Sequence, residues 1–275
     1  MQKGRSGNME HIDRDAEKIK SLLIDVRNGI AVLTLNRPKY RNALSKSVIL
    51  ELSDALMELE NNSAVRVIII AARGPAFCSG HDMKEIRAYP SREFYANLFS
   101  LSSALMKQIL SLSKPVIAKV QGVTSAAGCQ LVATCDLAIA SDQVEFSTPG
   151  VDIGLFCSTP MVALSRNVGR KHAMHMLLTG DRISAQRALE IGLINDVVSP
   201  EKLDDAVEEL AQKIASKSLL AISMGKQAFY RQMEQGLSDA YEYTGLVMAE
   251  NMLARDAEEG IDAFLEKRLP QWSDS

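Results

Sequence analysis

The stretch KVQGVTSAAGCQLVATCD, residues 119–136, places a short strand, a turn of small residues and the start of a helix in succession. Residues 115–120 form an apolar, β-branched run that predicts a strand, which Gln121 and Gly122 interrupt. Residues 125–128 then lead into 129–133, a run without proline and with helical spacing. The order of these pieces predicts a turn at which the backbone is accessible.

This turn carries no bulky side chain, so a ligand can approach its main chain closely. The first N–H groups of the following helix have no internal partner, and the helix dipole directs its positive end to the same place. Such a turn can hold an anion, or an oxygen that becomes anionic during a reaction. Tight packing of a helix on a strand would use the same small residues without any ligand.

A second stretch of the same kind, VIIIAARGPAFCSGHDMKE, occupies residues 67–85. A buried strand is predicted over 67–71, small residues follow over 76–80, and a charged segment runs over 81–85. Two strand–turn–helix units can each supply one backbone N–H to a single carbonyl oxygen. The pair therefore predicts an oxyanion hole made from main chain.

The amino-acid composition excludes several classes of protein. The chain has 275 residues, of which 47% are hydrophobic and 24% charged, with a net charge of −3, as in a soluble globular protein with ample core. Slight acidity without a long basic block argues against a nucleic-acid partner. No apolar run reaches the ~18 residues of a membrane span. The polar N-terminus predicts a cytoplasmic protein, although an organellar protein whose transit peptide has been removed would look the same.

Cysteine and histidine spacing gives no sign of a metal site. The four cysteines form no CxxC pair and lie among apolar or small residues, which predicts buried, reduced thiols. His172 and His175 share a helix face, but the sequence offers no acidic third ligand within reach. Asp136, just before a strand, is predicted to be a structural turn or cap.

Strands alternate with helices along most of the chain. We expect a loose arm over residues 1–20, an α/β core over 21–200 and a helical region over 201–275. Asn28 and Gly29 favour a hairpin, and Ser45 can cap a helix. The predicted strands are 21–26, 30–35, 67–71, 115–120, 137–140, 144–147 and 194–198. The predicted helices are 46–61, 92–112, 127–133, 161–168, 171–178, 185–191, 203–216, 221–235, 237–255 and 258–267.

Six pieces in order resemble the crotonase (enoyl-CoA hydratase/isomerase) family across nearly the whole chain. They are RPKYRNAL (37–44), AFCSGHD (76–82), AAGC (126–129), CD (135–136), LTG (178–180) and ALEIGL (188–193). The resemblance implies an α/β fold, a spiral of strand–strand–helix units with a helical C-terminal region that builds homotrimers, often paired into hexamers. It also implies an acyl-CoA thioester as ligand, with coenzyme A as part of the substrate and no permanently bound cofactor.

The resemblance implies that the thioester oxygen lies between the backbone N–H groups of Cys78 and Ala127, in agreement with the two small-residue turns. Ala127 stands where glycine is frequent, and its N–H stays available if φ is negative.

Further residues match the coenzyme A groove of the family. The groove would be lined by Asn42, Ala43, Leu44, Ala76, His81, Asp82 and Met83. Phe264 and Lys267 match positions that reach the nucleotide end, commonly that of a neighbouring subunit. A solvated helix end is the alternative for Lys267 and Arg268, and a groove-lining or capping histidine is the alternative for His81.

The family pattern breaks where hydratases carry their two acid/base glutamates, because Gln130 and Gly150 occupy those places. A carboxamide has no proton to exchange near neutral pH, and glycine has no side chain. The carboxylate that isomerases carry further along is also missing, with Cys157 to Thr159 in its place. We therefore expect hydratase activity to be weak or absent, and we expect Gly150 to leave room for a larger acyl group.

Other groups could replace the missing pair. Glu145 and Asp152 lie near Gly150 in sequence, although each could equally be solvated or paired, and Cys157 could act as a nucleophile only with a lowered pKa and a nearby base. The leading hypothesis is an acyl-CoA enzyme that stabilises a thioester enolate. The alternatives are a non-catalytic acyl-CoA-binding protein, or another reaction of this type, such as isomerisation, thioester hydrolysis or decarboxylation.

Overall fold

The computed structural model describes residues 20–275, so the loose arm expected over 1–20 lies, apart from Lys20, outside the described residues. The described chain begins with a hairpin of β1 (Leu22–Arg27) and β2 (Ile30–Leu35). Asn28 and Gly29 both have positive φ, 50° and 80°, as the tight hairpin turn requires. The predicted hairpin is therefore confirmed.

The main sheet has six strands in the order β1-β2-β3-β5-β7-β10. Its other members are β3 (Val67–Ala72), β5 (Val116–Val120), β7 (Leu137–Ser141) and β10 (Asp196–Val198). Every pair is parallel apart from the hairpin. Because both faces of a parallel sheet are covered, its central strands are continuous apolar runs, and five of the six residues of β3 are buried.

A second sheet has the order β4-β6-β8-β9. Its strands are β4 (Ala76–Cys78), β6 (Val123–Ser125), β8 (Glu145–Ser147) and β9 (Ile183–Ser184). The sequence predicted β8, but it assigned the residues of β4 to a turn and gave no strand at β6 or β9. Strands of two or three residues are too short to carry an alternating pattern, so only their pairing with distant segments reveals them.

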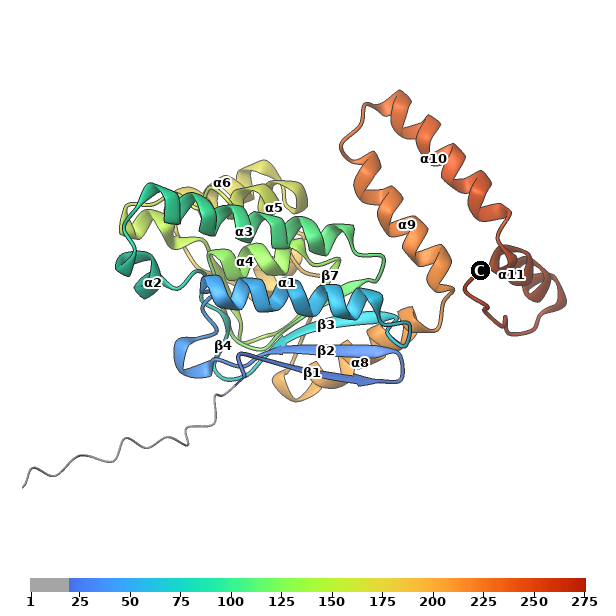
Figure 1. The fold of residues 1–275 in the computed structure, drawn as a ribbon, viewed down its shortest axis with the longest axis horizontal. Helices are drawn as coiled ribbons and strands as arrows, with labels where there is room; N and C mark the ends of the chain where they lie inside the picture. Colours follow the sequence, from blue (N-terminus) through green and yellow to red (C-terminus); the bar gives the residue numbers. More distant parts are fainter. Residues whose placement is uncertain (1–19) are drawn as a thin grey trace, which may run out of the picture.

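The two sheets are built together by a repeating unit. Each of β3, β5 and β7 in the main sheet is followed directly by β4, β6 or β8 in the second sheet, and helices come next. Successive units stack closely: a β-carbon on Gly122 would overlap the Pro75 carbonyl oxygen, which accepts a hydrogen bond from Val123 N–H. The architecture is therefore a spiral of strand–strand–helix units (Figure 1).

Helices surround the sheets (Figure 1). They are α1 (Lys46–Asn61), α2 (Met83–Ala88), α3 (Arg92–Ser111), α4 (Ala127–Thr134), α5 (Pro160–Asn167), α6 (Arg170–Thr179), α7 (Ala185–Glu190), α8 (Leu203–Ala215), α9 (Leu219–Gln232), α10 (Leu237–Met252) and α11 (Arg255–Glu266). Ser45 caps α1 by accepting from Val48 N–H, as predicted. All ten predicted helices are present, and their ends differ by three residues at most, as where α9 ends at 232 rather than 235. Where α2 lies, the sequence predicts only a charged segment over 81–85.

The C-terminal helices divide into two groups. Leu203, Val207 and Ala211 of α8 pack on the main sheet against residues such as Ile69 and Ile117. Helices α9, α10 and α11, which we call the C-terminal arm (residues 219–266), extend to one side of the body (Figure 1). The arm buries few side chains, with Ala228 as the one buried residue of α9.

Candidate functional site

The two turns that the sequence singled out lie in contact. A β-carbon on Gly128, in the first turn of α4, would overlap the carbonyl oxygen of Cys78 at the end of β4. A β-carbon on Gly80 would lie 3.0 Å from Ala126 Cβ and 3.4 Å from Ala127 N. Backbone from the two segments can approach this closely because these residues have no side chain.

The turn before α4 has an unusual backbone. Ala126 is the N-cap residue, with φ 50° and ψ −116°, a region that L-residues rarely adopt. Its N–H donates to the Ser147 carbonyl oxygen of β8 at 2.9 Å, which holds the turn in place. Ala127 does not share the positive φ, so the condition on its N–H is met. As the first helical residue, Ala127 has no intrahelical acceptor for that N–H.

The other unit differs from the prediction. Helix α2 begins at Met83, capped by Asp82, whereas Cys78 ends a short strand. The Cys78 N–H is therefore not part of a helix N-terminus, and the dipole argument applies to α4 alone. The local signal for this cap is Asp82 itself, an N-cap residue with Glu85 three positions later.

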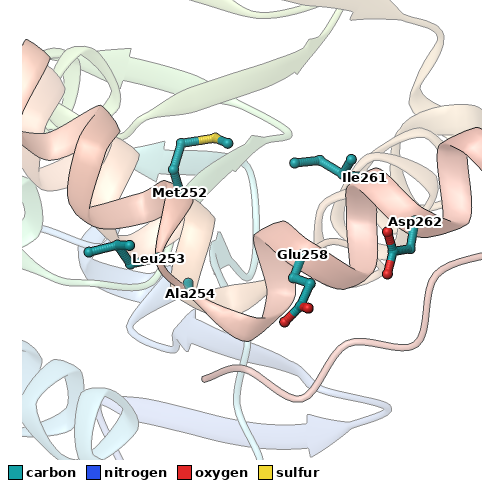
Figure 2. Close-up of a pocket in the computed structure, with 6 residues that line it drawn as sticks. All are labelled: Met252, Leu253, Ala254, Glu258, Ile261 and Asp262. Carbon is teal, nitrogen blue, oxygen red and sulfur yellow. The ribbon is translucent and has the colours of Figure 1, made fainter.

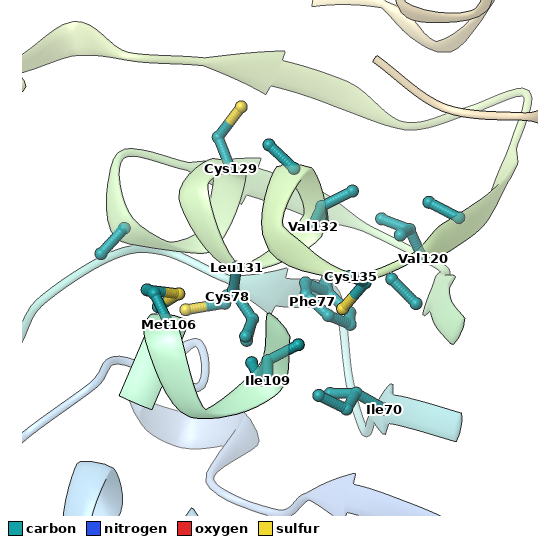
Figure 3. Close-up of a cluster of buried hydrophobic side chains, with 14 of the residues drawn as sticks. Ile70, Phe77, Cys78, Met106, Ile109, Val120, Cys129, Leu131, Val132 and Cys135 are labelled. Atoms are coloured by element: carbon teal, nitrogen blue, oxygen red, sulfur yellow. The ribbon is translucent and has the colours of Figure 1, made fainter. Parts of the chain in front are cut away.

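The side chain of Cys78 belongs to the core. Figure 3 shows Cys78 beside Met106 and Ile109 of α3, while Cys129 lies on the far side of α4. Burial raises the pKa of the Cys78 and Cys129 thiols to about 12, and it also raises the pKa of Cys157. The thiols of the described residues are therefore protonated and weakly nucleophilic near neutral pH, so a role of Cys78 in binding would be that of its backbone.

Gln130 is enclosed close to the turn. It is 4% exposed, and its Oε1 is buried without a hydrogen-bond partner. Gln130 lies three residues after Ala127 on α4, and such residues share a helix face, with side chains leaning toward the N-terminus. A carboxamide here can donate and accept hydrogen bonds, but it cannot transfer a proton.

Gly150 does not open the predicted extra room. It lies in the 3-10 helix η2 (Pro149–Ile153), and a β-carbon on it would stand 2.8 Å from the Leu155 carbonyl oxygen and 2.9 Å from Cys157 Sγ. The segment after η2 folds back, and Leu155 N–H donates to the Gly150 carbonyl oxygen at 2.9 Å. The expectation of a larger acyl pocket is wrong at this position, because residues 155–157 of the same chain fill the space beside Gly150.

The carboxylates considered as substitutes are placed elsewhere. Glu145 Oε2 accepts from Arg182 Nη1 at 3.0 Å on the surface of the second sheet. Asp152 is exposed and lies beside Gly180, where a β-carbon would stand 3.1 Å from its Oδ1. Glu145 is thus paired, as the alternative interpretation had it, and neither carboxylate is brought to Gln130 by the contacts of the described chain.

The residues of the expected coenzyme A groove form one continuous backbone structure. Leu44 N–H donates to the Gly80 carbonyl oxygen at 2.8 Å, and Asp82 N–H donates to the Leu44 carbonyl oxygen at 3.1 Å. Ala43, Leu44 and Ala76 are buried. The Asn42 side chain is fully used inside the protein. Its Nδ2 donates to the carbonyl oxygens of Arg73 and Ala76, and its Oδ1 accepts from Arg37 N–H.

His81, Asp82 and Met83 line the edge of this structure. His81 Nε2 lies 3.2 Å from Ser102 Oγ of α3, and its ring meets Phe99 edge to face at 5.3 Å. Burial lowers the pKa of His81 to about 4, so the ring is neutral near pH 7. The Asp82 carboxylate caps α2, whereas Met83 is 46% exposed.

Phe264 and Lys267 are far from this groove within one chain. Helix α11 lies at the opposite side of the molecule from α2 (Figure 1). Phe264 is 80% exposed, and Lys267 ends α11 in the left-handed conformation. A pocket of about 360 Å³ lies where α10 ends and α11 begins. Figure 2 shows its lining residues, which include Met252 at the end of α10, Leu253 just after it, and Glu258 and Ile261 of α11. This pocket belongs to the arm, away from the two turns.

The histidines on α6 are engaged with neighbours. His172 Nδ1 lies 3.3 Å from Arg187 Nη2, and His175 Nε2 lies 3.9 Å from Asp181 Oδ2. Across residues 20–275, no three His, Cys, Asp or Glu side chains are grouped so as to hold a metal ion. Over the same residues, no helix combines the length and the apolar character needed to span a membrane.

Known proteins that are similar to this chain carry names of the enoyl-CoA hydratase/isomerase family. The family model described as enoyl-CoA hydratase/isomerase matches residues 25–275. The human protein named enoyl-CoA hydratase domain-containing protein 3, mitochondrial, is 48% identical over 246 residues, covering 90% of this chain and 81% of its own. The short-chain-enoyl-CoA hydratase of Clostridium acetobutylicum is 33% identical over 258 residues, covering 91% and 97%.

Solved structures of the same family have a similar fold. The crystal structure of an enoyl-CoA hydratase from Mycobacterium smegmatis has a TM-score of 0.90 at 50% identity, covering 92% of this chain and 99% of its own. The structure of human enoyl-CoA hydratase domain-containing protein 3 also gives 0.90, at 46% identity, covering 92% and 100%. The predicted resemblance to the family and the predicted fold are confirmed, and the domain-containing protein 3 branch is among the relatives that match nearly the whole chain. The expected cytoplasmic location gains no support, since the names of these domain-containing relatives place them in mitochondria.

Proposed function

The chain belongs to the enoyl-CoA hydratase/isomerase family, and we propose that it binds an acyl-CoA thioester and stabilises negative charge on the thioester oxygen with the backbone N–H groups of Cys78 and Ala127. The observation that carries this proposal is the close backbone contact between residues 78–80 and 126–128. Two N–H groups from these segments would point to one oxygen, in a place from which bulky side chains are absent.

The coenzyme A part would lie along the backbone of residues 42–44 and 76–83. Hydrogen bonds between these two segments give the groove a rigid wall of backbone. The buried Asn42 side chain stabilises this wall by donating to the carbonyl oxygens of Arg73 and Ala76. The adenine and pantetheine would contact main chain and the exposed Met83 rather than Asn42 or Asp82, whose polar side-chain atoms already have partners. A neutral His81 adds no charge to this wall.

Weak or absent hydration follows from the residues around the turn. Water addition needs a group that takes and returns a proton at the α- and β-carbons, and each such group contributes about 10²–10⁴ in rate. Gln130 and Gly150 cannot do this, and Glu145 is occupied by Arg182. Gln130 would instead orient the acyl group or a water molecule through its unpartnered carboxamide oxygen.

A non-catalytic acyl-CoA-binding protein is the second candidate. It is favoured by the close backbone contact of the two turns together with the missing carboxylates. Gln130 and Gly150 stand at the places of the hydratase glutamates, and Cys157 lies in the segment where isomerases carry their carboxylate. Isomerisation or thioester hydrolysis would use the same two N–H groups, but each would require a carboxylate or a positioned water near the α-carbon.

The chain would assemble as a homotrimer, alone or paired into a hexamer. The arm exposes many large apolar side chains, a pattern typical of association surfaces. They include Phe229, Met233, Leu237, Leu246, Met248, Met252, Leu253, Phe264 and Leu265. Since α11 lies far from α2 within one chain, Phe264 and Lys267 would reach the nucleotide end of a ligand held by a neighbour (Figure 1).

Two assays on one preparation test the proposal. Calorimetric titration with butanoyl-CoA measures binding, and the absorbance of the conjugated thioester measures turnover of but-2-enoyl-CoA. We expect binding with little hydration. Rapid hydration would show that an unrecognised residue replaces the glutamates, and the absence of binding would refute the coenzyme A assignment.

A single substitution tests the position of the missing base. Gln130→Glu places a carboxylate on the α4 face that follows Ala127, whereas Gln130→Met keeps a similar shape without hydrogen-bonding atoms. If Gln130 faces the acyl group, the Glu variant gains hydration by about 10²-fold or more over the Met variant. Equal rates in both variants would place the acyl group elsewhere.

A further inference from the structure

The Cys135–Asp136 pair, one of the pieces shared with the family, leads to a polar cluster far from the two turns. Asp136 directly follows α4 and its C-cap residue Cys135. Its Oδ2 accepts from Val116 N–H at 2.7 Å, which ties it to β5. The same oxygen accepts from Lys226 Nζ at 2.7 Å, and Oδ1 accepts from the Tyr230 hydroxyl at 2.8 Å. Asp136 lies in the bend between α4 and β7, in agreement with the predicted structural turn, and its side chain also connects this bend to β5 and α9.

Lys226 completes the cluster from α9. Its Nζ also donates to the carbonyl oxygens of Ile109 at 3.0 Å and Lys114 at 2.9 Å, near the C-terminal end of α3. The three donor positions of the ammonium group are therefore all used. The side chains of Lys226 and Asp136 are 6% and 15% exposed, so water screens the pair little.

Tyr230 adds a neutral hydrogen bond one turn further along α9. Burial, together with the neighbouring Asp136 carboxylate, raises the pKa of the Tyr230 phenol well above its usual range. The hydroxyl therefore keeps its proton and donates it to Asp136. Lys226 and Tyr230 are four residues apart, so they share one face of α9 and both reach Asp136.

Other polar contacts between α9 and the body lie near its two ends. Leu219 N–H donates to Asp274 Oδ1, whose carboxylate pairs with Arg66, and Glu234, just beyond α9, pairs with Arg166. Ala228, between the two donors, is the one residue of α9 that is buried, and α10 packs along α9 rather than on the sheets (Figure 1). Apolar contacts do not select one orientation of a helix, because they depend little on angle. The four hydrogen bonds that Lys226 and Tyr230 donate do depend on angle, so they fix both the position and the rotation of α9.

We propose that Asp136, Lys226 and Tyr230 are positioning residues that anchor the C-terminal arm to the body and set its direction relative to α4. Because α4 is eight residues and about 12 Å long, the anchor at one end and the turn at Ala127 at the other belong to one rigid element. The arm surface and the oxyanion turn are thereby held in a fixed relation. This inference does not depend on the ligand.

Hydrogen–deuterium exchange on the full chain tests the anchor. In Lys226→Met, amides of α9 and α10 should exchange about tenfold faster or more, while those of β3 and β5 stay close to wild type. Tyr230→Phe keeps the ion pair and removes one hydrogen bond, so it should give a smaller increase confined to α9. This milder variant keeps the test valid if Lys226→Met fails to fold.

Two further variants distinguish the loss of the anchor from the loss of assembly and from a general loss of stability. Leu246→Glu places a charge on an exposed arm residue, so it should reduce assembly while residues 226–230 stay protected. In the double variant Lys226→Met/Asp136→Asn the buried charge is gone, so the body should regain stability while α9 remains fast to exchange. Wild-type exchange of α9 in Lys226→Met, or full recovery of α9 in the double variant, would overturn the proposal. So would a uniform rise over the whole chain.

Discussion

Cys157 Sγ occupies the space that a side chain at Gly150 would enter, since a β-carbon there would lie 2.9 Å from the sulfur. Glycine at 150 is therefore a packing requirement, in addition to being the loss of a carboxylate. Restoring the carboxylate alone would not restore the site.

Gly150→Glu should destabilise the protein by about 1–3 kcal/mol, because the new side chain must displace Cys157 or the Leu155 carbonyl. Urea unfolding measures the difference. Gly245→Ala in α10 is the matched control: a β-carbon there meets nothing within 4 Å, and the change should stabilise the helix by about 0.5–1 kcal/mol. Wild-type stability of Gly150→Glu would mean that the segment after η2 yields easily.

Gln130→Glu should make stability depend on pH. Burial without a partner raises the pKa of the introduced carboxyl above its unfolded value, so the folded variant binds the proton more tightly. Its stability relative to Gln130→Met is then retained at low pH and falls as pH rises through the raised pKa, by about 1–4 kcal/mol. Urea midpoints at pH 5 and pH 8 give the comparison, and a constant difference would show that residue 130 is solvated.

Ala126→Gly should leave stability unchanged or raise it by about 1 kcal/mol. Alanine at φ 50° and ψ −116° is strained by about 1–3 kcal/mol, and glycine relieves this while costing somewhat more backbone entropy. Ala133→Gly, inside α4, should instead cost about 1 kcal/mol or more. Thermal unfolding of both variants is the measurement. An equal loss in the two would argue against strain at Ala126.

His81 should make the protein sensitive to acid. Its pKa falls from 6.5 in the unfolded chain to about 4 when folded, so the unfolded state binds the proton between these values. Stability is complete above pH 6.5 and declines as pH falls toward 4, by about 1–3 kcal/mol. His81→Gln should remove this part of the decline, and exposed His175→Gln serves as the control substitution. A decline of the same size in His81→Gln would assign the effect to other groups.

Local signals were sufficient where structure depends on neighbouring residues. The Asn28–Gly29 turn follows from the backbone freedom of these two residues, and the Ser45 cap follows from a side-chain oxygen beside a helix start. Most of the second sheet did not follow, because Ala76–Cys78 and Val123–Ser125 are strands only through pairing with each other and, for the latter, with β8. The short helix α2 was missed although Asp82 and Glu85 carry a capping signal.

The sequence by itself determined the family, the order of the main-sheet strands and of the longer helices, and the absence of carboxylates at Gln130 and Gly150, because each of these is a property of residue types and their spacing. The tertiary structure alone decided that Cys157 fills the space at Gly150 and that Asp136 meets Lys226, 90 residues away. Such relations depend on which distant segments pack together, and that packing is set by the burial of the whole chain rather than by any local pattern.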